Sequence, residues 1–170
     1  MSRIELCKTP VGFLARLLGV STLIMSPLLI ACNSDPVPQH WIHGAQVAAE
    51  YRDEAKVLRL APGWSWPTEL NYPDKDEDGN NQLYEVNTGR VEAAWYWHCS
   101  WARTFLSETN PTQRKAALMN VLEIRESAFY RWGSDDVERR RNDQMLSDVK
   151  TGNTEFFEQT IKLNCPVSSK

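Results

Sequence analysis

Apolar residues recur every three or four positions in several stretches of the chain, and this spacing places them on one face of an α-helix. In the stretch 45–60 the apolar positions are Ala48, Tyr51, Ala55 and Leu58, with charged residues between them. We therefore predict an amphipathic helix, whose last four residues equally suit a short strand. The Pro-Gly pair that follows ends either element.

The most aromatic stripe begins after Thr88, a residue type that caps helix N-termini. Its apolar positions are Val91, Ala94, Trp95, His98, Cys99, Ala102, Phe105 and Leu106. We predict that this helix is the centre of the fold. Between Gly63 and Thr88 no helical period is sustained, which predicts one long irregular segment.

A start signal for another helix lies at residues 110–113, where asparagine suits the cap, proline the first turn and glutamine the third position. A stripe from Leu118 to Trp132 follows, broken only by Arg125, and Gly133 is placed to end it. We predict one helix that runs from this signal to about Trp132.

Ser134 is placed to cap the next helix, which has acidic residues in its first turn and Gly152 just past its end. The sequence of residues 153–164 predicts a final short helix. The pattern therefore indicates a mostly α fold: a compact domain of four or five helices packed around residues 95–105, with one long irregular segment and little strand. The pattern does not determine how the helices are connected in space.

The N-terminal residues differ from the rest, because a basic start is followed by an apolar run without charge from Leu17 to Ile30. This is the profile of a signal peptide. The fifteen uncharged residues before Cys32 are fewer than the roughly 20 that a membrane-spanning helix needs. The run ends in Leu29-Ile30-Ala31-Cys32, which resembles the lipobox of bacterial lipoproteins.

The lipobox resemblance implies a processing pathway and a location. A signal peptide of residues 1–31 would be cut before Cys32, whose thiol would carry a diacylglyceryl group. Residues 32–40 would then form a lipidated tether, and residues 41–170 a single helical domain on the extracytoplasmic side of the cell membrane. The alternative is cleavage at an ordinary secretory signal and a soluble exported protein.

Charge and cysteine content narrow the picture further. Removing residues 1–31 takes three basic and one acidic residue from totals of 19 and 22, which leaves 16 against 21 and a net charge of −5. A mildly acidic domain binds polyanions poorly, so we expect no nucleic-acid partner. With Cys7 in the signal and Cys32 lipidated, we expect Cys99 and Cys165 to form a disulfide rather than remain as buried free thiols.

Residues 74–85 resemble the twelve-residue calcium loop of EF-hand proteins. The residues at its oxygen-ligand places are Asp74, Asp76, Asp78, Asn80, Gln82 and Glu85. Alternate oxygen atoms can converge on a hard cation, Gly79 permits the sharp bend, and Glu85 can bind bidentately. The loop departs from the pattern, because Asn81 holds a usually apolar place and Pro73 precedes the loop where a helix belongs. We therefore predict at most a single Ca²⁺ clip, with a solvated acidic turn as the alternative.

Aromatic motifs of the folded part resemble small exported proteins of high-GC Gram-positive bacteria. These motifs are the Pro62-Gly63 turn, Trp66-Pro67, and Trp97-His98-Cys99-Ser100-Trp101. Since that family has no assigned function, the resemblance implies an exported compartment and nothing about chemistry.

The sequence carries no recognisable catalytic motif. The Ser147–Lys150 and Lys150–Gly152 stretches match SxxK and KTG patterns of penicillin-binding enzymes but share one lysine, and GxSxG and HExxH are absent. We interpret His40 and His43 as a surface pair and His98 as a satisfied core histidine.

Seven tryptophans are many for this length. Trp64 and Trp66 would share a face of an extended segment, which makes them candidates for stacking on glycan rings, whereas we expect Trp95 and Trp132 in the core. The run Arg139–Arg141 is expected to form a solvated, ion-paired helix face.

The sequence therefore favours a non-enzymatic binding or structural lipoprotein of the cell envelope. Its expected partners are the membrane, through the lipid anchor, and an envelope protein or glycan. The alternative is a calcium-stabilised extracellular binding module that uses the loop from Asp74 to Glu85. A wall-active hydrolase is the third hypothesis, and no acid, base or nucleophile can be named for it from the sequence.

Overall fold

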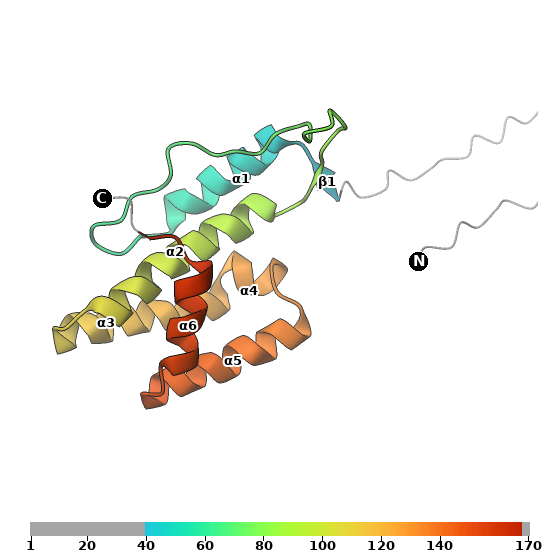
Figure 1. Ribbon diagram of the computed structural model, residues 1–170. Coiled ribbons are helices and arrows are strands. Elements are labelled where there is room, and N and C mark those ends of the chain that lie inside the picture. Colours follow the sequence, from blue (N-terminus) through green and yellow to red (C-terminus); the bar gives the residue numbers. More distant parts are fainter. Residues whose placement is uncertain (1–39, 168–170) are drawn as a thin grey trace, which may run out of the picture. The chain divides into compact units, whose positions relative to one another are not determined.

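Six α-helices and one 3₁₀ turn make up most of residues 40–167, which are the residues that the computed structural model describes and which belong to one compact unit (Figure 1). The elements are β1 (Trp41–Ile42), α1 (Gly44–Val57), β2 (Tyr84–Glu85), α2 (Thr88–Ser107), α3 (Pro111–Leu122), the 3₁₀ turn η1 (Glu123–Glu126), α4 (Ala128–Trp132), α5 (Asp136–Thr151) and α6 (Glu155–Asn164). Five of the helices have ten or more residues, which confirms the predicted mostly α fold. The predicted signal peptide, the lipobox and most of the tether lie outside the described residues.

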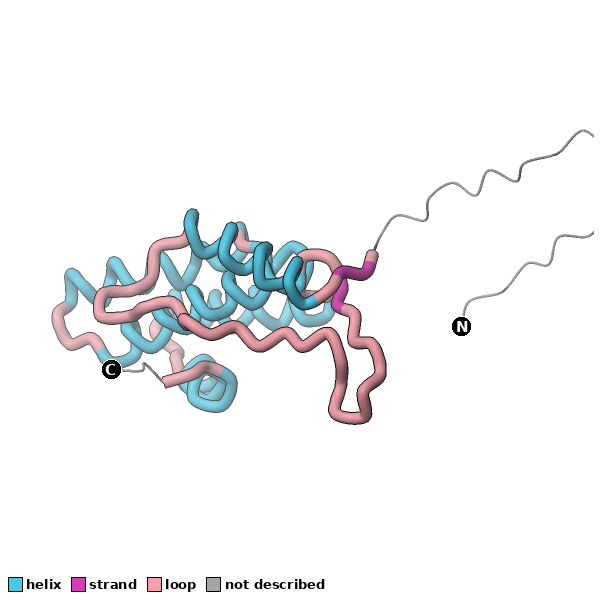
Figure 2. The backbone as a smooth tube through the Cα atoms, turned by 90° about the horizontal axis from the view of Figure 1, so that it is seen from above, coloured by secondary structure: helices cyan, strands magenta, loops and turns pink. Residues whose placement is uncertain are grey.

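Helix α2 is the centre of the fold, as its apolar stripe predicts, and α1, α3, α4 and α6 all pack against it. Figure 1 shows α1 running beside α2, and α6 standing across the other helices, so that Figure 2 views α6 along its axis. The main core lies between α2, α3, α5 and α6. Its buried residues are Trp97, Cys99, Ala102, Phe105, Ala117, Val121, Ile124, Met145, Leu146, Val149, Phe157, Ile161 and Cys165.

The disulfide predicted between Cys99 and Cys165 is present, with a Cα–Cα distance of 5.4 Å. It joins the middle of α2 to the residue that follows α6. Arg103 adds to this junction, because its Nη2 atom donates to the carbonyl oxygens of Cys165 at 2.6 Å and Ile161 at 3.4 Å. The C-terminal helix is therefore fixed to the central helix at its end.

The long segment between α1 and α2 is irregular, as predicted, apart from short antiparallel pairings at its far end (Figure 2). Aromatic residues of α2 hold it in place. The Nε1 atoms of Trp97 and Trp101 both donate to the Arg59 carbonyl oxygen, at 3.0 and 2.9 Å. Ala61 N donates to the Ser100 hydroxyl at 3.2 Å. Val57 is the last residue of α1, and residues 58–60 do not form the short strand that their sequence also allowed.

Two predicted helix caps lie one residue away from the observed ones. Asn87, with φ of 76°, is the N-cap of α2, and the Thr88 hydroxyl instead donates to the Glu85 carbonyl at 2.7 Å. Asp135 caps α5, because its carboxylate accepts two backbone N–H bonds of that helix at 2.8 Å. Ser134, the predicted cap, is buried and donates to the Phe129 carbonyl.

The single helix predicted to run to Trp132 is wrong, since α3 ends at Leu122 and Ser127 starts the short α4. The Ser127 hydroxyl donates to the Ile124 carbonyl at 2.6 Å, which stabilises the intervening 3₁₀ turn. Arg125, which interrupted the apolar stripe, lies on this turn and pairs with Asp143 of α5, with Nε and Oδ1 2.7 Å apart. The break therefore places Arg125 in contact with α5, and the local sequence pattern does not reveal this contact.

Trp132 is not a core residue, because 51% of it is exposed. The break before α4 ends the helical register that placed Trp132 on the same stripe as Leu118. Its ring lies under the Arg131 guanidinium at 5.9 Å instead. Trp95, the other predicted core tryptophan, is partly buried and packs against the core.

Candidate binding groove

Two adjoining recesses meet at the rings of Trp95 and Phe129, whose centroids are 4.7 Å apart. The first, here called the tyrosine recess, has a volume of about 530 Å³ and is lined by Tyr51, Pro67, Glu69, Leu70, Asn71, Tyr72, Val91, Glu92, Trp95, Tyr96, Phe129, Asn164 and Pro166. The second, the arginine recess, has a volume of about 490 Å³ and is lined by Trp95, Phe129, Glu138, Arg141, Asn142, Met145, Phe156, Gln159, Thr160, Leu163 and Asn164. We call the two together the Trp95 groove.

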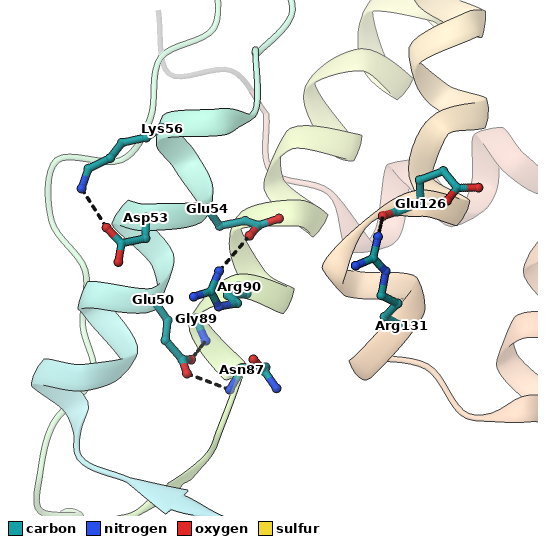
Figure 3. A network of polar contacts seen from close by, with 9 residues as sticks. All are labelled: Glu50, Asp53, Glu54, Lys56, Asn87, Gly89, Arg90, Glu126 and Arg131. Carbon is teal, nitrogen blue, oxygen red and sulfur yellow. Dashed lines mark hydrogen bonds and ion pairs between the residues drawn. The ribbon is translucent and has the colours of Figure 1, made fainter.

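Residues of both α1 and α2 line the tyrosine recess. Figure 3 shows the polar contacts at the junction of these two helices. Glu50 of α1 accepts backbone N–H bonds from Asn87 at 2.9 Å and Gly89 at 3.2 Å, where the N-terminus of α2 leaves such donors unpaired. A Cβ atom on Gly89 would collide with the Val47 carbonyl oxygen, so glycine allows the helices this close approach. Tyr51, the next residue of α1, lines the recess.

The irregular segment contributes Tyr72 to the lining of the same recess. Gly44 N donates to Asp74 Oδ1 at 2.8 Å, which fixes the segment to the start of α1. A Cβ atom on Gly44 would collide with the Tyr72 carbonyl, so here too glycine permits the contact. The Tyr72 hydroxyl then donates to Glu92 Oε2 at 2.6 Å and closes this corner of the recess.

The tyrosine recess combines aromatic rings with negative charge. The Tyr51 hydroxyl oxygen is buried and has no hydrogen-bond partner among the described atoms. Burial raises the pKa of Tyr51, and nearby Tyr96 and Glu92 raise it further. Burial and the hydrogen bond to Glu92 likewise raise the pKa of Tyr72. Both phenols are therefore neutral at pH 7. Among the residues that line the recess, Glu69 and Glu92 have acidic side chains and none has a basic one.

The arginine recess has a more mixed lining. The Arg141 guanidinium lies 5.1 Å from the Phe156 ring centroid, and Phe156 and Leu163 expose 42% and 82% of their surfaces. Three amide side chains, Asn142, Gln159 and Asn164, also line this recess. It therefore offers apolar contact together with hydrogen-bond donors and acceptors.

The predicted calcium loop folds as a tight hairpin. Two of its carboxylates, those of Asp74 and Asp76, already accept hydrogen bonds from backbone N–H groups. Asp76 Oδ1 accepts N–H bonds from Asp78 at 3.0 Å and Asn80 at 2.8 Å, and hydrogen bonds from Asn80 are the main reason that the pKa of Asp76 is lowered. Asp74 accepts from Gly44, as described above. Its other close neighbour is His43, whose Nδ1 lies 3.6 Å from Asp74 Oδ1.

The remaining predicted calcium ligands are dispersed along the same segment. Gln82 N donates to the Asp74 carbonyl, and Glu85 lies in β2, where it pairs with Trp41. Within residues 40–167, no three His, Cys, Asp or Glu side chains gather as a metal-ion site. The Ca²⁺ hypothesis therefore stays a prediction, and this hairpin does not display a ready coordination shell.

Trp64 and Trp66 pack against the protein itself. Their ring centroids lie 5.8 and 5.5 Å from that of Tyr96, and Trp66 also meets the ring of Tyr51 edge-on at 5.8 Å. They contact rings that line the tyrosine recess but do not line the groove themselves, so its aromatic surface comes from other residues. Stacking of these two tryptophans on a glycan stays a prediction.

His98 and the arginine run were also singled out from the sequence, and both contact other residues of the protein. His98 is fully buried between the rings of Trp95 and Phe157, and burial lowers its pKa to about 3. It is a core residue as predicted, but its Nδ1 atom lacks a hydrogen-bond partner in the described structure, so it is not fully satisfied. Arg139 pairs with Asp136 at 3.3 Å, in keeping with the predicted ion-paired face, whereas Arg141 of the same run packs on the Phe156 ring.

Sequence reasoning missed the residues that define the tyrosine recess, namely Tyr72, Glu92 and the hydroxyl of Tyr51. Tyr51 was an apolar helix position in the pattern, and Glu92 was an unremarked charge on a helix; neither carried a separate signal.

None of the helices in residues 40–167 has the length and apolar character needed to cross a membrane. No protein-family model matches the chain, and no curated protein or solved structure shows significant similarity to it.

Proposed function

We propose that this chain is a lipid-anchored, non-enzymatic lipoprotein of the cell envelope, whose helical domain binds another envelope component through the Trp95 groove. The observation that carries the binding role is the groove itself, in which stacked aromatic rings join two recesses of ligand-binding size. Exposed apolar side chains such as Leu163 continue this surface, and such patches mark interaction sites.

The anchoring part of the proposal rests on the lipobox at Leu29–Cys32 and is tested separately. The wild-type full chain should fractionate with membranes, whereas Cys32→Ser should appear in the soluble exported fraction, because acyl chains on one cysteine supply the anchor. Membrane retention of Cys32→Ser would overturn the anchoring proposal and leave the groove unaffected.

The binding role is tested by site-specific crosslinking in intact cells. A photo-reactive benzoylphenylalanine at Leu163 lies in the groove, and the same residue at Val57, which is 77% exposed and outside the groove lining, is the matched control. We expect a discrete crosslinked species from position 163 and none from position 57. Equal crosslinking at both positions, or none at either, would contradict a specific binding groove.

A wall-active hydrolase is the second candidate, because Glu69 and Glu92 line one aromatic recess and glycosidases use paired carboxyl groups. Glu92 Oε2 accepts the hydrogen bond from the Tyr72 hydroxyl at 2.6 Å, so one oxygen of this carboxyl group is already engaged within the protein. The full chain should therefore release no reducing ends from purified peptidoglycan. Release that Glu92→Gln abolishes would establish the hydrolase instead.

A further inference from the structure

We propose that the tyrosine recess binds a primary alkylammonium group, presented as a lysine-type side chain on an envelope peptide. This inference rests on the proposed function, since it names the chemistry of the ligand that the Trp95 groove takes. Three features of the recess support it: the sign of its charge, its aromatic walls, and a buried phenol without a partner.

The charge of the recess selects a cation. Glu69 and Glu92 are both exposed at its rim, and none of the residues that line it is lysine, arginine or histidine. A concave site of one sign concentrates ligands of the opposite sign. The arginine recess provides a contrast within the same groove, because there Arg141 offsets Glu138.

The walls suit the alkyl part of such a ligand. Trp95, Tyr96 and Phe129 offer ring surfaces, and an alkylammonium combines an apolar stem with a charged end that aromatic faces attract. A neutral apolar chain would gain the ring contacts but would leave the carboxylates without a counter-charge. The recess is therefore matched to a chain that ends in a positive group.

The Tyr51 hydroxyl discriminates between kinds of cation. Buried hydroxyls normally have a hydrogen-bond partner, and this one has none although it lies near Glu92 in the recess wall. A primary ammonium has three N–H donors and no acceptor. Tyr51, Glu92 and Asn71 are lining residues of one recess, and a phenol oxygen, a carboxylate and an amide oxygen can each accept one of these N–H bonds. A quaternary ammonium has no N–H donor and would leave the phenol unpaired.

The adjoining recess indicates that the ammonium belongs to a peptide. The two recesses share Trp95, Phe129 and Asn164, so a ligand anchored in one continues into the other. There Asn142, Gln159 and Asn164 provide amide groups, which pair with both the N–H and the C=O of a peptide backbone. A free amine would use only the tyrosine recess.

The test is a binding titration of the full chain, purified in detergent, followed by the fluorescence of its tryptophans and by amide chemical shifts. The probes are N-acetyl-lysine N′-methylamide, its norleucine and trimethyl-lysine counterparts, and n-pentylammonium. We expect the lysine probe to bind about tenfold more tightly than the norleucine and trimethyl-lysine probes, because hydrogen bonds to a charged group are lost in both. The n-pentylammonium probe should bind more weakly than the lysine probe, and equal affinity would assign the site to a free amine.

Two variants and two matched controls locate the site. Tyr51→Phe and Glu92→Gln should each weaken binding of the lysine probe by about tenfold. Tyr51→Phe keeps the ring and removes only an unpartnered oxygen, so its melting temperature should not fall. Tyr130→Phe, on α4, and Glu77→Gln, on the exposed hairpin, both lie outside the lining of either recess and should leave the affinity unchanged.

Three results would overturn the ammonium assignment: equal binding of the lysine and norleucine probes, unchanged affinity in folded Tyr51→Phe and Glu92→Gln, or binding of neutral oligosaccharides in preference to the lysine probe. Crosslinking from position 163 distinguishes this failure from failure of the proposed function. If position 163 still crosslinks while the amines do not bind, the groove binds a different ligand; if both fail, neither proposal holds.

Discussion

Tyr51, His98 and Arg103 each place a polar side-chain atom inside the fold without a partner in residues 40–167, and the surroundings of the first two differ. Tyr51 Oη lies in the wall of the tyrosine recess, while His98 Nδ1 lies between aromatic rings of the core. The sequence predicted that both residues face inward, because helical periodicity fixes the face of a residue. It does not fix the neighbours on that face, and so the missing partners were not predictable.

His98 should make the stability of the domain depend on pH between 7 and 5. Its folded pKa of about 3 lies far below the ordinary value of 6.5, because burial disfavours the charged ring. Below pH 6.5 the unfolded chain therefore binds a proton that the folded chain does not, and the free energy of unfolding falls as pH falls. We expect a loss of about 2 kcal/mol from pH 7 to pH 5, measured by urea denaturation.

The control for this prediction is His98→Gln, which removes the titrating group at the same position. Whatever its absolute stability, the variant should lose most of the pH dependence, since His40 and His43 are exposed. The same loss of stability in His98→Gln as in the wild-type chain would show that other groups cause it.

At the scale of elements, apolar periodicity and the signals for helix ends together predicted every long helix, and the errors lie at ends and breaks. The caps of α2 and α5 were misplaced by one residue, because two neighbouring residues can each cap and the tertiary contacts decide between them. The break between α3 and α4 carried no local signal except Arg125, whose partner Asp143 lies 18 residues further along the chain. Contacts over such separations are invisible to a pattern with a period of 3.6 residues.

Glu50 should contribute to stability as a cap supplied by one helix to another. Glu50→Ala leaves the Asn87 and Gly89 N–H groups without their acceptor, and we expect a loss of about 1–2 kcal/mol in the free energy of unfolding. Asp53→Ala is the matched control on the same helix, because it removes only an exposed pair with Lys56, which is worth little. Similar losses in chemical denaturation of both variants would contradict an inter-helix cap.

The Cys99–Cys165 disulfide should be the largest single constraint on α6. It closes a loop with a sequence separation of 66, and on the chain-entropy model its removal costs about 4 kcal/mol. We expect thermal melting of the wild-type chain to fall markedly when a reductant is added. The double variant Cys99→Ala, Cys165→Ala should melt early and be insensitive to reductant; a wild-type melting temperature that reductant leaves unchanged would contradict the prediction.

At the scale of the whole molecule, the Trp95 groove joins residues that lie far apart in the sequence. Tyr51 and Tyr72 come from α1 and the irregular segment, Trp95 from α2, and Asn164 from the end of α6. The mostly α class and the disulfide followed from the sequence. The groove did not, because the irregular segment has no period from which its path over α2 could be derived.

The hairpin from Asp74 to Glu85 gives the last prediction. A bound Ca²⁺ would need oxygen atoms from Asp74, Asp76 and Glu85 to converge, yet the first caps α1, the second holds the turn, and the third lies in β2. Convergence would break these hydrogen bonds, and an exposed loop regains little free energy in return. We therefore expect millimolar Ca²⁺ and Mg²⁺ to shift tryptophan-monitored melting of the full chain equally, relative to EDTA. A calcium-specific rise that Glu85→Gln abolishes would instead establish the calcium site, because ligand binding to the folded state alone adds to stability.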